Sequence, residues 1–363
     1  MYRTPLFDIH KKLNGKLVEF GGWEMPLYYS GVVAEHIGVR ENVGLFDICH
    51  MGRLTVNGPD SESFLQKVTV NNVAALIPGR AQYSLVCNPE GGVKDDIFIY
   101  KKGDGNYFLC VNASNREKIY QWLLAQGEKE NVTIEDVSNK LGMLALQGPK
   151  APQLLERVLG RKYRKLKHAE FYEEEMAGTP VMIARTGYTG ERGYEFYFPI
   201  QSTERLWELF IKVGKEEGII PVGLGARDTL RLEMGYALYG HELGEDISPL
   251  EADLSKFVFF DKSFIGKDSL QRQKEKGLSR ILVGFELKIR NVPRQNCKVF
   301  HADREIGVVT SGNLTPSVQK GIGLAFIQIP WSREGEALFV SIRDKKIPAI
   351  VTEKCFLKKK RLK

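Results

Sequence analysis

The chain has 363 residues, of which 43% are hydrophobic and 27% charged, so it is long enough for two or three domains with buried cores. Its formal net charge is +7, but five positive charges lie in the last six residues, KKKRLK, and the remainder carries only +2. This distribution argues against a broad nucleic-acid-binding surface. No apolar run reaches the roughly 20 residues of a membrane-spanning helix, and the first residues lack the apolar centre of a signal peptide.

The five cysteines indicate a reducing compartment. They are an odd number, lie far apart and form no CxxC pair, and no histidine stands at a spacing typical of a zinc site. Thiols in this arrangement are typical of a protein that stays reduced. We therefore expect a cytoplasmic protein without a bound metal ion.

Two segments share one pattern. Residues 54–68 (LTVNGPDSESFLQKV) and 144–158 (LALQGPKAPQLLERV) each begin with an apolar stretch, continue through Gly-Pro and end in an amphipathic stretch. A proline in the first helical turn costs no hydrogen bond, because the amide that it replaces has no partner there. The pattern predicts a strand, a turn and a helix in each segment, and thus two related α+β units.

Other stretches alternate between apolar and polar residues. Residues 81–88, 95–102 and 106–112 are bounded by Gly, Asn and Pro, which predicts antiparallel strands. Over residues 182–198 we expect a strand, a glycine-rich turn and a second strand.

The composition changes towards the carboxyl end. Helices are expected over residues 203–217 and 227–237, followed by a charged helix over 269–276. After that helix come short β-like runs at close spacing (ILVGFEL, EIGVVTS, IGLAFIQI, ALFVSI, IPAIVTE). Such runs are typical of a small closed β domain, and we place its boundary near residue 277.

Two adjacent carboxylates lie in the segment GGVKDDIFIY. On a strand, Asp95 and Asp96 point to opposite faces, so they cannot act together as an acid and a base. Asp96 shares its face with Phe98 and Tyr100, which suits a cationic centre beside a flat heteroaromatic ring. The same pattern also fits a half-buried strand whose aspartate closes a hairpin.

A second carboxylate follows a glycine-rich turn. In ARTGYTGERGYEFYF, Tyr188 lies in the turn and Glu195 on the returning strand. If its face is buried, Glu195 needs hydrogen-bond donors, and a ligand edge with two parallel N–H groups would supply them as arginine does. The pterin ring has such an edge. The alternative is an outward glutamate on an amphipathic hairpin.

A cation lies at the start of a helix that is predicted to open near Ala226, within GLGARD. Arg227 lies in the first turn, where the helix dipole disfavours a positive charge unless an anion is near. Asp228 or the carboxylate of a ligand could be that anion. GLGARD is not a dinucleotide-binding fingerprint, because the third glycine and the preceding strand pattern are missing.

Together these pieces resemble the glycine cleavage T-protein family over nearly the whole chain, from Arg3 to about residue 357. Eight blocks follow in the order of that family: RTPLFDIH, FGGWEMPLYY, GLFDICHMG, GGVKDDIFIY, LQGPKA, RTGYTGERGYE, GLGARDTLRLE and VTSGNLTPSV. The resemblance implies an α+β fold of three domains in a cloverleaf around a central folate pocket. By that resemblance, residues 1–50 and 140–276 form interleaved folate-binding α+β parts, residues 51–139 a ferredoxin-like unit, and residues 277–363 a β-barrel.

The resemblance also implies the roles of individual residues. Asp96 would be the catalytic carboxylate, and Glu195 would hold the pterin edge. Lys358, in CFLK where the family often has ProPheTyr and then Lys or Arg, could meet the glutamate moiety, and Arg294 matches a position that looks important for the carrier. The other residues expected to line the cofactor pocket are Arg227, Tyr188, Tyr83, Asn112, Met51 and Phe98.

The activity implied is transfer of a one-carbon unit from the aminomethyl group on lipoylated H-protein to tetrahydrofolate. The products are 5,10-methylenetetrahydrofolate, ammonia and the dihydrolipoyl carrier. A related folate enzyme that acts on another donor is an alternative. A folate-binding iron-sulfur maintenance protein is a further alternative, but the KGCYxGQE-type motif of such proteins is missing.

Overall fold

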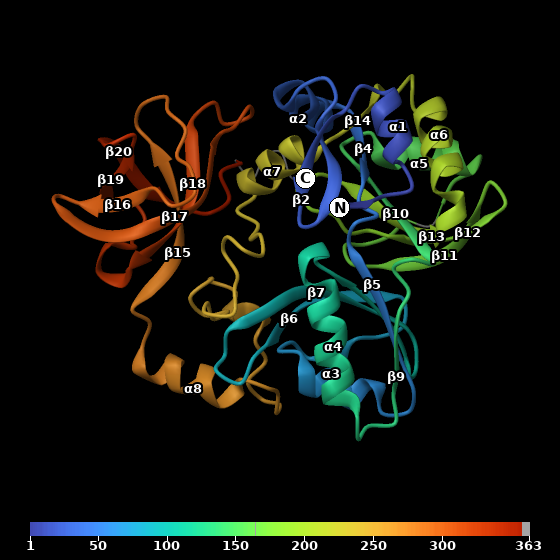
Figure 1. Ribbon diagram of the computed structural model, residues 1–363, viewed down its shortest axis with the longest axis horizontal. Helices are drawn as coiled ribbons and strands as arrows, with labels where there is room; N and C mark the ends of the chain where they lie inside the picture. The colour runs from blue at the N-terminus through green and yellow to red at the C-terminus, as the bar shows by residue number, and fades with distance from the viewer. Residues whose placement is uncertain (164, 358–363) are drawn as a thin grey trace. The chain divides into compact units, whose positions relative to one another are not determined.

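The computed structural model describes residues 1–163 and 165–357, which form two compact units. The first unit comprises residues 1–65, 72–83 and 97–227, and the second comprises residues 66–71, 84–96 and 228 onward. Their elements are labelled in Figure 1. The expected mixed α+β class, with antiparallel sheets and a carboxyl-terminal barrel, is confirmed. The three-domain division by residue number stays a prediction.

A six-stranded sheet in the first unit has the order β11-β12-β13-β10-β4-β14. All its neighbouring pairs are antiparallel except β14 with β4. Its strands are β4 (Val43–Asp47), β10 (Leu141–Gln147), β11 (Phe171–Met176), β12 (Thr179–Ala184), β13 (Gly193–Pro199) and β14 (Ile219–Pro221).

Helices α5 (Ala151–Leu159) and α6 (Thr203–Val213) pack against this sheet. Tyr194, Phe196 and Phe198 of β13 belong to the same buried cluster as Leu154 of α5 and Trp207 of α6. Because side chains alternate along a strand, the odd-numbered residues of β13 point away from these helices. Helix α6 ends four residues before the expected Glu217, since the amide of Gly214 closes its last turn on Phe210.

The first unit also contains smaller elements. A three-stranded sheet has the order β1-β3-β2. Its strands are β1 (Tyr2–Arg3), β2 (Lys16–Phe20) and β3 (Trp23–Tyr28), and helices α1 (Phe7–Lys12) and α2 (Val32–Glu41) contact β3. Helix α4 (Arg116–Gly127) also lies in this unit.

A five-stranded sheet has the order β6-β7-β8-β5-β9. Its strands are β5 (Gly52–Asn57), β6 (Arg80–Cys87), β7 (Val93–Gly103), β8 (Asn106–Val111) and β9 (Thr133–Asp136), and helix α3 (Ser61–Val68) follows β5. Strands β6 and β7 and helix α3 each cross the boundary between the units. Strands β6, β7 and β8 cover the three alternating stretches, so the strands expected there are confirmed.

The two Gly-Pro segments form the same local structure, as predicted. Each contains a strand, a turn and a helix, namely β5 with α3 and β10 with α5. The glycines have positive φ angles, +128° at Gly58 and +141° at Gly148. A Cβ atom at either would lie 2.4 Å from a backbone oxygen, that of Asn131 or Asn42. Glycine is required at both turns because any side chain would collide with the chain that crosses there.

The second unit contains a closed barrel of order β15-β18-β17-β16-β19-β20, coloured orange to red in Figure 1. Its interior holds Val, Ile, Leu and Phe side chains. Its strands are β15 (Arg280–Leu287), β16 (Lys298–His301), β17 (Arg304–Leu314), β18 (Gly321–Gln328), β19 (Ala337–Ile342) and β20 (Lys345–Thr352).

Helices α7 (Leu224–Glu233) and α8 (Lys267–Lys276) are the last α-helices before the barrel in the chain. Helix α8 agrees with the expected charged helix. Helix α7 begins before and ends before the expected range, because Gly235, with φ +67°, closes it by a bond from its amide to Leu232. In the described part of the chain, no helix has the length and apolar character needed to cross a membrane.

Candidate active site

Glu195 occupies the centre of the six-stranded sheet, on the face of β13 away from the helices. Its neighbours across the strands are Ala145 of β10 and Ala184 of β12, whose small side chains leave room beside the carboxylate. Only 9% of the residue is exposed. Oε2 accepts a 2.5 Å hydrogen bond from the hydroxyl of Thr186 and a 3.5 Å bond from that of Tyr197. Of the two orientations that the sequence left open for Glu195, the structure shows the buried one.

The surroundings of Glu195 disfavour its charge. Burial raises the pKa of this carboxyl above its ordinary value, and the Thr186 hydroxyl and the charge of Arg227 offset only part of that rise. Neighbouring thiol and phenol groups stay neutral, because burial raises the pKa of Cys110 to about 12 and that of Tyr197 well above its ordinary value. Glu195 is thus buried away from water, and the charge of Arg227 acts on it.

Aromatic rings form a wall beside Glu195. The Tyr100 hydroxyl lies 2.9 Å from the Tyr197 hydroxyl and 3.4 Å from that of Thr186. Edge-to-face contacts continue the wall, with ring centroids 5.6 Å apart for Tyr100 and Tyr197 and 5.7 Å apart for Tyr83 and Phe98. Phe98 joins the two pairs, since its centroid is 6.3 Å from that of Tyr100. Tyr100 and Tyr197 are buried, whereas Tyr83 and Phe98 are partly exposed and could stack on a flat ring.

Arg227 and Tyr188 lie together in the first unit. The Arg227 guanidinium lies 4.7 Å from the centroid of the Tyr188 ring. Its place in the first turn of α7 is fixed by a 3.2 Å bond from its amide to the Gly223 carbonyl. The neighbouring Asp228 forms a 2.7 Å ion pair with Arg231. The charge of Arg227 lowers the pKa of Glu195, so the two side chains interact electrostatically.

The turn between β4 and β5 presents Met51. The buried Arg53 donates hydrogen bonds to the carbonyls of Cys49 and Met51, at 2.7 and 2.5 Å, and to that of Ser138. At the other end of the turn, the Asp47 carboxylate accepts a 2.9 Å bond from the Cys49 amide. Two buried charged residues therefore hold the backbone on both sides of the half-buried Met51.

Within the same turn, His50 is a neutral imidazole. Burial, reinforced by the charge of Arg227, lowers the pKa of His50 to about 3. Its ring meets that of Phe20 edge to face at 5.9 Å. Its Nδ1 atom is buried and has no hydrogen-bond partner among the described residues.

Strand β7 separates the two adjacent aspartates as the alternation predicted. Asp95, Ile97 and Ile99 are buried, whereas Asp96 and Phe98 are half-buried. Asp96 ends the part of β7 that belongs to the second unit, and Phe98 lies in the part that belongs to the first. The two acidic side chains therefore have different surroundings, and Asp96 has the more accessible one.

Three further residues were predicted, namely Asn112, Arg294 and Lys358. Asn112 follows β8 and is half-buried at the start of the 3₁₀-helix η2 (Ala113–Asn115). Arg294 is exposed in the loop before β16 in the second unit. Lys358 falls outside the described residues.

Sequence reasoning missed the residues that hold Glu195. Thr186 and Tyr197 each donate to Oε2. A signal for Tyr197 was present, because residues i and i+2 of a strand share a face. No comparable pattern marked Thr186, which lies in the turn region nine residues before Glu195.

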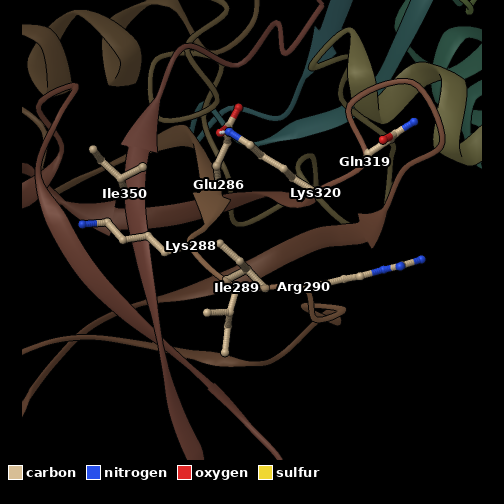
Figure 2. Close-up of a pocket in the computed structure, with 8 residues that line it drawn as sticks. Glu286, Lys288, Ile289, Arg290, Gln319, Lys320 and Ile350 are labelled. Atoms are coloured by element: carbon tan, nitrogen blue, oxygen red, sulfur yellow. Dashed lines mark hydrogen bonds and ion pairs between the residues drawn. The ribbon is translucent and has the colours of Figure 1, made fainter.

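The second unit has a pocket in its barrel, shown in Figure 2. Its volume is about 320 Å³. Lys320 forms a 2.6 Å hydrogen-bonded ion pair with Glu286, and in Figure 2 Lys288 and Arg290 extend to opposite sides of the exposed Ile289. The pocket therefore combines an apolar part with an excess of positive charge. Of the described residues, no three His, Cys, Asp or Glu side chains gather as a metal site would require.

Comparison with known proteins identifies the family. Residues 6–262 match the GCVT N-terminal domain, and residues 280–358 match the glycine cleavage T-protein C-terminal barrel domain. An aminomethyltransferase of Caldanaerobacter subterraneus subsp. tengcongensis is 45% identical over 98% of this chain and 96% of its own length. One of Bacillus cereus is 44% identical over 99% of each chain.

A solved structure agrees with these matches. The chain superposes on the glycine cleavage system aminomethyltransferase T of Bartonella henselae with a TM-score of 0.92, at 32% identity and over 98% of each chain. The similarity extends over both family domains and both compact units. The chain therefore belongs to the glycine cleavage T-protein family, the aminomethyltransferases.

Proposed function

We propose that this aminomethyltransferase moves the methylene carbon of an aminomethyl group on lipoylated H-protein to tetrahydrofolate. The products are 5,10-methylenetetrahydrofolate, ammonia and the dihydrolipoyl carrier. The observation that carries the folate part is the buried Glu195 carboxylate beside an aromatic wall and a cation. A buried carboxylate whose charge is disfavoured is suited to a ligand that offers paired N–H donors.

Glu195 is the residue that we assign to the pterin edge. Its two hydrogen bonds, from Thr186 and Tyr197, end on Oε2, so Oε1 is the acceptor that we assign to the ligand. A charge-assisted hydrogen bond to Oε1 also helps to orient the ring. Arg227, Tyr188, Tyr83, Phe98, Met51 and Asn112 are proposed to line the pocket.

Asp96 is the proposed catalytic carboxylate. In the donor, the carbon to be transferred is bonded to both sulfur and nitrogen. As it leaves the sulfur it becomes cationic and iminium-like, and a fixed carboxylate stabilises that charge electrostatically. The same group can take the proton from a folate nitrogen during ring closure. The half-buried position of Asp96, opposite the fully buried Asp95, supports this choice of carboxylate. The largest contribution we expect is orientation of the two reactants.

The carrier is proposed to approach the barrel of the second unit. Lys288, Arg290 and Lys320 line its pocket, which favours an acidic partner surface. The exposed Arg294 is the further residue that we assign to carrier contact.

Lys358 is proposed to meet the glutamate moiety of folate as a point charge. All five cysteines are free thiols, which supports the proposed cytoplasmic location.

The test is an exchange assay. Dihydrolipoyl H-protein, that is, lipoylated carrier kept reduced by added dithiol, is supplied with ammonia and methylenetetrahydrofolate, and aminomethyl-loaded carrier is measured by mass spectrometry. We expect loading that requires both the enzyme and the lipoyl group. Loading that does not depend on the lipoyl group would exclude the proposed donor. Without detectable tetrahydrofolate binding by calorimetry, the folate assignment fails as well.

A further inference from the structure

A buried carboxylate outside the proposed pocket holds the start of helix α7. Glu35 lies in the first turn of α2 and is fully buried. Its Oε1 accepts hydrogen bonds from the amides of Tyr29, Ser30 and Gly31, at 2.5, 2.8 and 3.2 Å. Its Oε2 accepts a 2.8 Å bond from the amide of Gly223, 188 residues further along the chain.

The position of Glu35 balances its charge. Gly31 is the residue before α2, and Gly223 is the residue before α7, so both amides belong to the positive ends of helices. A carboxylate with four backbone donors at two helix starts is satisfied although it is buried. An amide side chain would keep only one acceptor oxygen and would turn a donor towards one of the two groups.

The segment that Glu35 holds has little freedom. A Cβ atom at Gly223 would lie 2.5 Å from the Leu27 carbonyl, and one at Gly225 would lie 2.5 Å from a methyl group of Val32. The two glycines therefore let the start of α7 pack closely against β3 and α2. One turn later, Arg227 donates its amide to the Gly223 carbonyl and places its guanidinium over the Tyr188 ring.

We propose that Glu35 is a positioning residue for tetrahydrofolate, because its bond to the Gly223 amide sets the place of Arg227 over Tyr188 and beside Glu195. This inference rests on the proposed role of Arg227 in folate binding. The side chain of Glu35 touches no reacting atom in this scheme. Its effect reaches the pocket through one turn of α7.

The test measures tetrahydrofolate affinity in a double-mutant cycle of Glu35→Gln and Arg227→Ala. Because Glu35 acts on folate only through one turn of α7, we expect Glu35→Gln to weaken binding about five- to tenfold, less than the loss of a direct bond to a charged group. In steady-state assays the KM for tetrahydrofolate rises, while the KM for lipoylated carrier and kcat at saturating folate change less than about twofold. In the Arg227→Ala background, Glu35→Gln has less than about a twofold further effect.

Glu217→Gln is the matched control. Glu217 is also a buried carboxylate of the first unit, but its partner is Arg157, at 2.7 Å. We expect this substitution to leave folate affinity unchanged even if it lowers the melting temperature. If Glu35→Gln does not fold, Glu35→Asp keeps the charge, draws it back by one methylene and serves the same cycle.

The outcomes separate the two ideas. If the unmodified protein binds no tetrahydrofolate, the proposed function fails. If that protein binds it and Arg227→Ala weakens binding, but Glu35→Gln binds normally, the positioning role is wrong. If Glu35→Gln lowers tetrahydrofolate affinity equally with and without Arg227, the positioning role is also wrong, because Glu35 would then act independently of Arg227.

Discussion

Replacing Glu195 by glutamine should weaken folate binding and stabilise the free protein. In the folded variant, the oxygen of the new side-chain amide can keep the 2.5 Å bond from Thr186 that Oε2 now accepts. The amide nitrogen then takes the place of Oε1 and turns a donor towards the N–H donors of the pterin edge. The loss is at least one charge-assisted bond, about 1.5–3 kcal/mol, or about 10- to 150-fold in Kd.

The stability of the free protein should change in the opposite direction. Because burial raises the pKa of Glu195 above its ordinary 4.5, the folded state holds this proton more tightly than the unfolded state. The stabilisation from this group is complete below pH 4.5 and is lost as the pH rises through the folded pKa. Glutamine carries no such charge, so at pH 7 we expect Glu195→Gln to have the higher melting temperature.

Two measurements check this reasoning. Calorimetric titration with tetrahydrofolate gives Kd, and thermal unfolding of the free protein between pH 4.5 and 8 gives the stability difference. That difference should grow with pH, since only the unmodified protein loses stability as Glu195 ionises. An unchanged Kd would refute the pterin assignment, and a lower melting temperature of Glu195→Gln at pH 7 would refute the account of its burial.

The other predictions concern the proposed catalytic carboxylate, a turn and a buried lysine. Asp96→Asn should bind tetrahydrofolate normally and lose most turnover in the exchange assay. The control is Asp95→Asn, with turnover measured per folded molecule. Near-normal turnover of Asp96→Asn would contradict the catalytic role of Asp96. Gly148→Ala should cost more than about 2 kcal/mol in urea unfolding, because φ is +141° and the new Cβ would lie 2.4 Å from the Asn42 carbonyl oxygen. Burial lowers the pKa of Lys262, which donates to the carbonyls of Gln66 and Thr69, to about 7, so stability should rise between pH 7 and about 10.5. Lys262→Met should remove that rise, and an unchanged pH profile would exclude Lys262 as its source.

Local patterns were enough for several features. The face that Asp96 shares with Phe98 followed from alternation along one strand, and the structure shows the expected burial of Asp95 and Ile97 on the other face. The two Gly-Pro turns and the barrel strands were also predicted, because each depends on residues close together in the chain. The family resemblance rested on motif blocks, and the comparisons confirm it.

Helix ends were less predictable. The pattern extended α6 to Glu217 and α7 to Ala237, but both helices end four residues earlier. Gly214 and Gly235 close their last turns through backbone bonds. Apolar periodicity continues past such a turn and therefore does not mark where the backbone leaves the helix.

The surroundings of each carboxylate were decided by the tertiary structure alone. From the sequence, Glu195 could equally have pointed outward, and Glu35 showed no sign of importance. The fold buries Glu195 between Thr186 and Tyr197, and it brings Gly223 to Glu35 across 188 residues. Contacts of this kind depend on how sheets and helices pack, which no local pattern encodes. The sequence by itself thus determined the family and the candidate residues, whereas the packing determined which groups hold them in place.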